Sequence, residues 1–75
     1  RAGEIGGTMT TVLNGANEVA VGLFLEDKIK FLDIANIVEM AMDNHKTIKN
    51  PTVWDILETD RWAREYVNTN LHRLK

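Results

Sequence analysis

Apolar residues recur at helical spacing in the first third of the chain. They are three or four positions apart and fall on one broad arc of a helix: Val12, Leu13, Ala16, Val19, Ala20, Leu23 and Phe24. Just before them, the Gly6-Gly7 pair gives the backbone the freedom that a chain reversal needs. The threonines around Thr10 can cap a helix N-terminus. The pattern predicts a helix from about Thr11 to about Glu26.

A second helical pattern follows a polar connection. Ile29 and Phe31 alternate with lysines, which is typical of a short extended link. Asp33 is an acidic residue suited to the positive end of a helix, so it is expected to open the next one. The apolar face of this helix consists of Ile34, Ile37, Val38, Ala41 and His45. We expect it to end near residues 44–46.

Two further helices are predicted after the turn at Pro51, because proline disfavours a helical residue before it. Thr52 and Asp55 have the spacing of a capping box, which would open a short helix through Leu57. Asp60 is expected to cap the last helix. The apolar stripe of that helix is Ala63, Tyr66, Val67, Leu71 and Leu74.

These elements define the fold class. No stretch has the alternation of a strand, so the fold is predicted to be all-α, a small bundle of about three to four helices with short connections. A chain of 75 residues forms one domain at most, here residues 1–75. It has no cysteine, so neither a disulfide nor a thiolate zinc site can stabilise it. Its stability must come from packing or from a partner.

The residue types present exclude several kinds of function. The chain has neither serine nor cysteine, the commonest covalent nucleophiles. Its two histidines, His45 and His72, lack the spacing of a zinc site. We interpret His45 as part of a helix face and His72 as a solvated residue. No glycine-rich phosphate loop occurs either, so we expect no catalytic, cofactor-binding or metal-binding residue in this chain.

Charge and hydropathy exclude two classes of partner. The net charge is −2, and the basic residues are scattered. The helix expected at residues 11–26 has no basic residue, so a helix-turn-helix DNA-binding module is disfavoured and we expect no nucleic-acid partner. No run of about 18 apolar residues exists, and the first residues have no signal-peptide pattern, so we expect no membrane partner.

The two tryptophans, Trp54 and Trp62, flank the junction expected between the last two helices. We favour the interpretation that both close the end of the bundle. The alternative is that one of them is exposed for docking, because tryptophan is enriched at protein interfaces.

A second face of the helix expected at residues 11–26 needs an explanation. Asparagine is unfavourable inside a helix, and two asparagines beside a glutamate suggest fixed partners. Apolar side chains on the same side argue against a fully solvated face. Gly15 and Gly22 lie along one edge, where another backbone could come close. We therefore predict an interface with another part of a longer protein, formed by Asn14, Asn17, Glu18, Val21 and Leu25.

Four segments of the chain resemble one known family, the deoxyxylulose phosphate reductoisomerases. Residues 13–21, LNGANEVAV, closely resemble the family's LNAANEVAV signature, and GGTM at 6–9 resembles the turn that precedes it. KIKFLDI at 28–34 is similar to KIxFxDI, and DRWARE at 60–65 is similar to DxxARE. One departure is Gly15, where the family usually has alanine.

The resemblance implies that the chain is the helical C-terminal domain of such an enzyme, with a structural role. The intact enzyme would convert 1-deoxy-D-xylulose 5-phosphate to 2-C-methyl-D-erythritol 4-phosphate with NADPH and a divalent cation, Mg or Mn. It would be a cytoplasmic homodimer, and the catalytic domain of the same protein would be this domain's partner. A start at Arg1 without methionine fits a fragment of that enzyme. The alternative is a small helical protein–protein interaction module with no enzymatic role.

Overall fold

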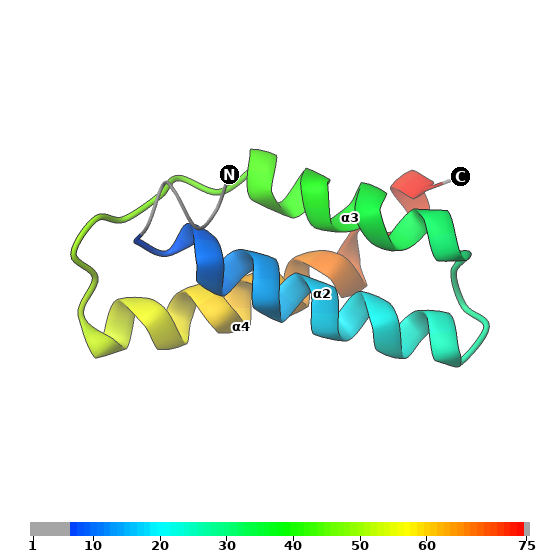
Figure 1. Cartoon of the computed structure of the whole chain (residues 1–75), viewed down its shortest axis with the longest axis horizontal. Helices are drawn as coiled ribbons and strands as arrows, with labels where there is room; N and C mark the ends of the chain where they lie inside the picture. Colours follow the sequence, from blue (N-terminus) through cyan, green and yellow to red (C-terminus); the bar gives the residue numbers. More distant parts are fainter. Residues whose placement is uncertain (1–6, 75) are drawn as a thin grey trace.

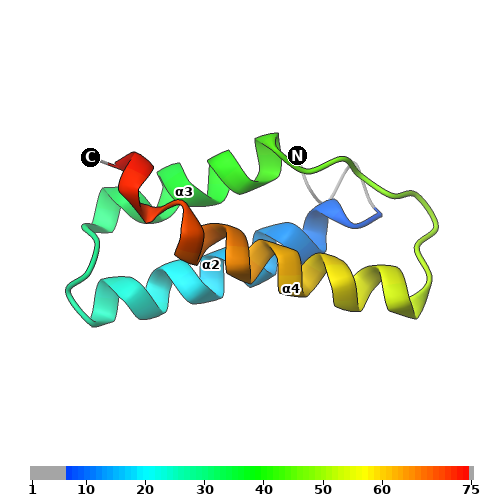
Figure 2. The ribbon, with the colours of Figure 1, turned by 180° about the vertical axis from the view of Figure 1, so that it is seen from behind.

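The computed structural model describes residues 7–74, in which helices follow one another without a strand, as the all-α prediction requires. The elements are α2 (Met9–Leu25), α3 (Phe31–Asp43), α4 (Val53–Thr69) and the short 3-10 helix η1 (Leu71–Leu74). Figure 1 shows α3 running back along α2, and α4 crossing α2 on its other side. The described part is thus a small elongated bundle, as Figure 2 also shows from behind.

Helix α2 is the centre of this bundle, because it packs against both α3 and α4, whereas α3 and α4 contact each other little. Small side chains in the contacts let the helix backbones come close. The buried apolar core is Met9, Val12, Ala16, Ala20, Ile37, Val38, Ala41, Ala63 and Val67. The apolar arc expected for the first helix supplies three of these residues, Val12, Ala16 and Ala20, and Met9 of α2 joins them from outside that arc.

The first two helices match their predicted ranges closely. Gly7 has a φ of +61°, so the expected chain reversal before α2 uses the conformation that glycine adopts without cost. The rest of the predicted break, Glu4 to Gly6, lies outside the described residues. The extended link predicted at Phe31 is wrong, because α3 begins there. The Lys30 N–H donates to Asp33 Oδ2 at 2.9 Å, which caps α3 two residues earlier than expected.

The break predicted between two helices near Asp60 is also wrong. Residues Val53–Thr69 form one continuous helix, opened by the predicted capping box of Thr52 and Asp55. Asp60 does not cap: its Oδ2 accepts a hydrogen bond of 2.9 Å from Arg64 Nε one turn later. An i,i+4 ion pair of this kind supports a helix that continues through the acidic residue.

The two tryptophans have different environments. Trp62 is partly buried and packs against the core, as the favoured interpretation predicted. Trp54 is 77% exposed, so the prediction that it closes the bundle is wrong. Because α4 is continuous, Trp54 lies in its first turn.

Candidate functional site

The candidate site is the outer face of α2. The side chains of Asn14, Asn17 and Glu18 are exposed, Val21 is half-buried, and Leu25 is 74% exposed. Within residues 7–74 the structure assigns no side-chain partner to the amides of the two asparagines. The five residues predicted as an interface are therefore accessible for one, and their role as an interface stays a prediction.

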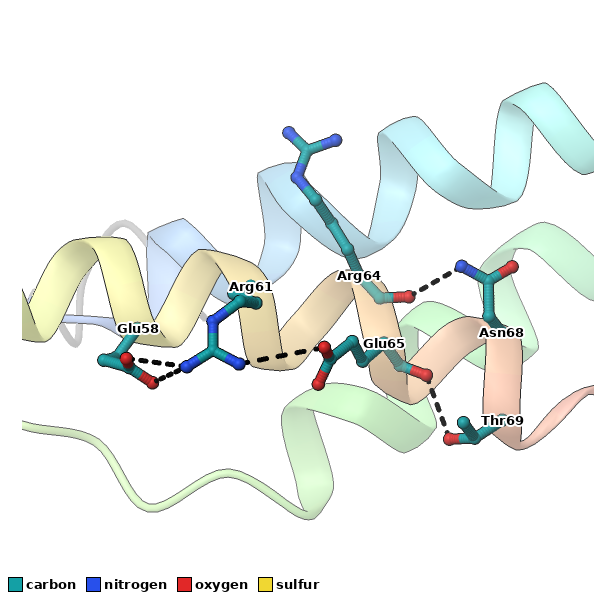
Figure 3. A network of polar contacts seen from close by, with 6 residues as sticks. All are labelled: Glu58, Arg61, Arg64, Glu65, Asn68 and Thr69. Atoms are coloured by element: carbon teal, nitrogen blue, oxygen red, sulfur yellow. Dashed lines mark hydrogen bonds and ion pairs between the residues drawn. The ribbon is translucent and has the colours of Figure 1, made fainter.

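Glu18 already has a partner inside the bundle. Its Oε1 lies 2.5 Å from Nη2 of Arg64, which in turn bonds Asp60 through Nε at 2.9 Å. Arg64 donates both bonds; the bond to Asp60 first and the bond to Glu18 second raise the pKa of Arg64, so the guanidinium stays charged. Figure 3 shows the Arg64 side chain reaching from α4 towards α2. The pair therefore joins α2 to α4, which gives Glu18 a role that needs no second domain.

The sequence predicted one shared role for Gly15 and Gly22 of α2, a close approach of another backbone. The structure instead gives the two glycines different surroundings. Gly15 is buried against α4: a Cβ there would lie 2.9 Å from Asp60 Oδ1 and 3.5 Å from Ala63 Cβ. A Cβ at Gly22 would meet nothing within 4 Å. The close approach predicted for these glycines exists at Gly15, and the backbone that comes close belongs to α4 of the same bundle.

An apolar groove continues the candidate site onto α3. It has a volume of about 410 Å³ and lies between α2 and α3. It is lined by Leu13, Asn17, Phe31, Leu32, Ile34, Ala35, Val38, Glu39 and Met42. Leu32 and Phe31 are 76% and 68% exposed, a large apolar surface for a small bundle. We call this groove and the five α2 residues the α2–α3 face.

The α3 half of this face was not predicted from the sequence. The spacing of Leu32, Ala35, Val38 and Met42 is itself helical, so α3 has a second apolar stripe beside the one that enters the core. Apolar residues on more than one side of a helix are typical of a helix with more than one packing contact. That signal was present in the sequence, but assigning Phe31 to an extended link concealed it.

The solvent-exposed surface of α4 also carries a network of paired charges. Arg61 bonds Glu58 at 2.6 Å and lies 3.8 Å from Glu65, as Figure 3 shows. The Asn68 side chain donates to the Arg64 carbonyl oxygen at 3.2 Å in the same view. Hydrogen bonding with Glu58 raises the pKa of Arg61. All of these charges are internally paired and solvated, so this is a stabilised helix surface with no unmatched charge for a ligand.

Comparison with known proteins identifies the setting of this face. The family described as "DXP reductoisomerase C-terminal domain" matches residues 1–66. The chain belongs to this family. Proteins named 1-deoxy-D-xylulose 5-phosphate reductoisomerase are similar to it: 59% identical over 66 residues in Caldanaerobacter subterraneus subsp. tengcongensis and 53% over 70 residues in Bacillus subtilis. The relative from Gloeobacter violaceus is 44% identical over 73 residues. No solved structure matches the chain.

The chain spans a small part of these relatives. It is covered for 88% of its length by the Caldanaerobacter relative and for 93% by the Bacillus relative, but accounts for 17% and 18% of their lengths. The relatives therefore each contain a long remainder that the match to this chain does not cover.

Metal-binding side chains do not gather in the described part of the chain. Within residues 7–74 no group of three or more His, Asp or Glu side chains is placed to hold a metal ion. His72 is exposed, as expected, and lies in η1, far along the chain from His45. No helix in this part of the chain is long and apolar enough to cross a membrane.

Proposed function

We propose that this chain is the C-terminal domain of an enzyme that converts 1-deoxy-D-xylulose 5-phosphate to 2-C-methyl-D-erythritol 4-phosphate. The family match over residues 1–66 carries the proposal, and the names of the relatives supply the activity. NADPH as reductant, a divalent cation (Mg or Mn), a homodimeric state and a cytoplasmic location belong to the same proposal. A separate interaction module does not account for 59% identity to a named enzyme.

The role proposed for the domain is to hold the catalytic part of the same protein in place. The α2–α3 face is the contact, with Asn14, Asn17, Glu18, Val21 and Leu25 on its α2 side. Its exposed leucines would be removed from water on docking, at about 25 cal/mol per Å² of apolar area. A shift of about 1 Å in catalytic groups can cost about 100-fold in rate, so a domain without catalytic residues can still control activity.

A chimera tests the activity. The matching C-terminal residues of the Bacillus subtilis relative are replaced by this chain, and oxidation of NADPH is followed with 1-deoxy-D-xylulose 5-phosphate and Mg²⁺ or Mn²⁺. We expect a turnover close to that of the parent enzyme, while deletion of the domain abolishes it. A soluble, folded chimera without activity would refute the proposal that this domain serves that reaction.

A matched pair of substitutions in the active chimera tests the docking face. Leu32→Asp places a charge in the α2–α3 groove, and Leu57→Asp places one on exposed α4, where Leu57 is 56% exposed. Both changes should leave the isolated chain folded, because both side chains are exposed. We expect only Leu32→Asp to lower the activity or thermal stability of the chimera. Equal effects of the two would show that the α2–α3 face is not the contact.

A further inference from the structure

The start of α2 is tied to the segment after α3 by three hydrogen bonds around Thr8. The Thr8 N–H donates to the Ile48 carbonyl oxygen at 3.2 Å, and the Ile48 N–H donates to Thr8 Oγ1 at 2.9 Å. Thr8 Oγ1 also lies 2.7 Å from Nε2 of His45. Thr8 is fully buried, and its hydroxyl does not cap α2 although Thr8 is the N-cap residue. The Thr8 hydroxyl therefore bonds His45 and leaves the first turn of α2 without a side-chain cap.

The protonation state of His45 decides whether these bonds are all satisfied. One lone pair of Thr8 Oγ1 accepts the Ile48 N–H, so the hydroxyl proton is free to donate to an unprotonated Nε2. Each donor then has one acceptor. When Nε2 is protonated, it can only donate. The Thr8 hydroxyl must then turn its proton towards a fully buried surrounding, where an unmet donor is costly.

We propose that Thr8 and His45 form an acid-released latch. While His45 is neutral with its proton on Nδ1, the latch holds the N-terminus of α2 against the α3–α4 connection; when Nε2 is also protonated, the Thr8 hydroxyl loses its acceptor and the latch is weakened. The latch lies at the N-terminus of α2, where the described helices begin. This inference goes beyond the proposed function and does not depend on it.

The Trp62 ring and the burial of His45 have opposite effects on the positive charge of His45. Its ring lies 5.5 Å from the Trp62 ring at an interplanar angle of 39°, and Trp62 packs on Tyr66 at 5.2 Å. A tryptophan face attracts a cation weakly where water has access. Burial opposes the charge, and it lowers the pKa of His45. A Thr8 hydroxyl proton left without an acceptor in a buried site adds to the effect of burial, so the neutral form is favoured.

Charged groups on the neighbouring elements do not counteract the lowering of the His45 pKa. On the segment of His45 itself, Asp43 and Lys46 are both exposed. On α4, the Glu58, Arg61 and Glu65 side chains are paired with one another. The first turns of α2 carry no titratable residue before Glu18, which is bonded to Arg64. Burial is the cause of the lowered pKa of His45, and no charged neighbour contributes to it.

The sign of the pH effect follows from this lowered pKa. The unfolded chain binds a proton at His45 at a higher pH than the folded chain does, so the latch contributes its full stability above the ordinary histidine pKa of 6.5. That stability is lost progressively as the pH falls below this value. The fold should therefore loosen at the start of α2 under mildly acidic conditions.

Nuclear magnetic resonance of the 75-residue chain tests the latch. In the His72→Gln background, His45 is titrated from about pH 8 to about pH 5, alongside the same chain unfolded in urea. We expect His45 to protonate at a lower pH in the folded chain. Amide exchange of Ile48, corrected for the intrinsic rate, should accelerate several-fold at acidic pH, while that of Ala20 in the middle of α2 stays unchanged.

Two variants separate the latch from general acid unfolding. His45→Gln keeps a polar partner for Thr8 but cannot titrate, so the exchange of Ile48 should become independent of pH. Thr8→Val keeps the shape but removes the hydroxyl that accepts the Ile48 N–H, so the exchange of Ile48 should be fast at every pH, whether or not His45 is protonated. If Thr8→Val fails to fold, the wild-type titration decides alone: a His45 that protonates at or above the pH of the unfolded chain, or an Ile48 exchange rate unaffected by pH, overturns the proposal.

Discussion

At the scale of single residues, Gly15 and Gly22 of α2 show that the same residue type can affect the stability of a helix differently at two positions. Both lie in a helix, where glycine is less favourable than alanine by about 1 kcal/mol. Gly22 faces open space, so nothing compensates for that cost in the isolated chain. Gly15 faces the Asp60 carboxylate, which occupies the place of its missing side chain.

We predict that Gly22→Ala stabilises the isolated chain by about 0.5–1 kcal/mol, because it only improves helix propensity. Gly15→Ala should gain less, since the new Cβ would displace Asp60 Oδ1 from 2.9 Å and weaken its bond with Arg64. Urea unfolding followed by circular dichroism measures both changes. An equal gain for the two variants would mean that Asp60 moves aside without cost.

Asn17 allows a second prediction at this scale. It lines the α2–α3 groove and is exposed in the isolated domain, so Asn17→Ala should change the stability of the isolated chain by no more than about 0.5 kcal/mol. In the intact enzyme we expect lower activity or a loss of about 1–3 kcal/mol of stability, the cost of a buried polar group without its partner. Glu18→Ala should behave similarly in the enzyme, but in the isolated chain it also breaks the pair with Arg64. Parallel denaturation and activity assays of both forms provide the comparison; equal effects in the two forms would assign Asn17 to the bundle itself.

At the scale of elements, a single N-terminal cap opens α4, whereas the sequence predicted two helices in this region, each with its own cap. Thr52 Oγ1 accepts the Asp55 N–H at 3.1 Å, and the Thr52 N–H donates to Asp55 Oδ2 at 2.9 Å. Both bonds satisfy groups that the first turn of a helix leaves without partners. The next acidic residue, Asp60, lies inside the helix and needs no such role.

We therefore predict that Thr52→Ala destabilises the isolated chain by about 1 kcal/mol, the usual cost of losing an N-cap. Asp60→Ala should cost less, because the residue pairs with Arg64 at a half-exposed site and caps nothing. Thermal unfolding of the two variants side by side is the measurement. A larger loss for Asp60→Ala would support a helix that starts at residue 60 and would contradict a continuous α4.

At the scale of the whole molecule, we expect no catalytic or cofactor-binding site in this domain. The expected consequence is that the isolated chain binds neither NADPH nor the sugar phosphate. It lacks a glycine-rich phosphate loop, and its basic residues are either scattered or paired with carboxylates. We predict no binding of NADPH in isothermal titration. A micromolar Kd would reveal a cofactor site in this domain and would require a catalytic role for it.

The sequence by itself determined the helical class, the central helix and the cap of α4. These features depend on neighbours three or four positions apart, and such local patterns are visible without a fold. The specific run at residues 13–21 also indicated the family, which the comparison confirms. The prediction of an interface on α2 came from the same periodicity, and it stays a prediction because its partner is not in this chain.

Only the tertiary structure decided how these helices use their polar residues. Arg64 and Glu18 are far apart in the sequence, so no local pattern could pair them, and the same holds for Gly15 facing Asp60. Thr8 and His45 are 37 positions apart, yet their hydrogen bond takes the threonine hydroxyl from its expected capping role. Helical periodicity assigns a residue to a face, but its partner depends on which helix packs on that face and at what distance. That is the physical reason why the elements could be read from the sequence and the contacts between them could not.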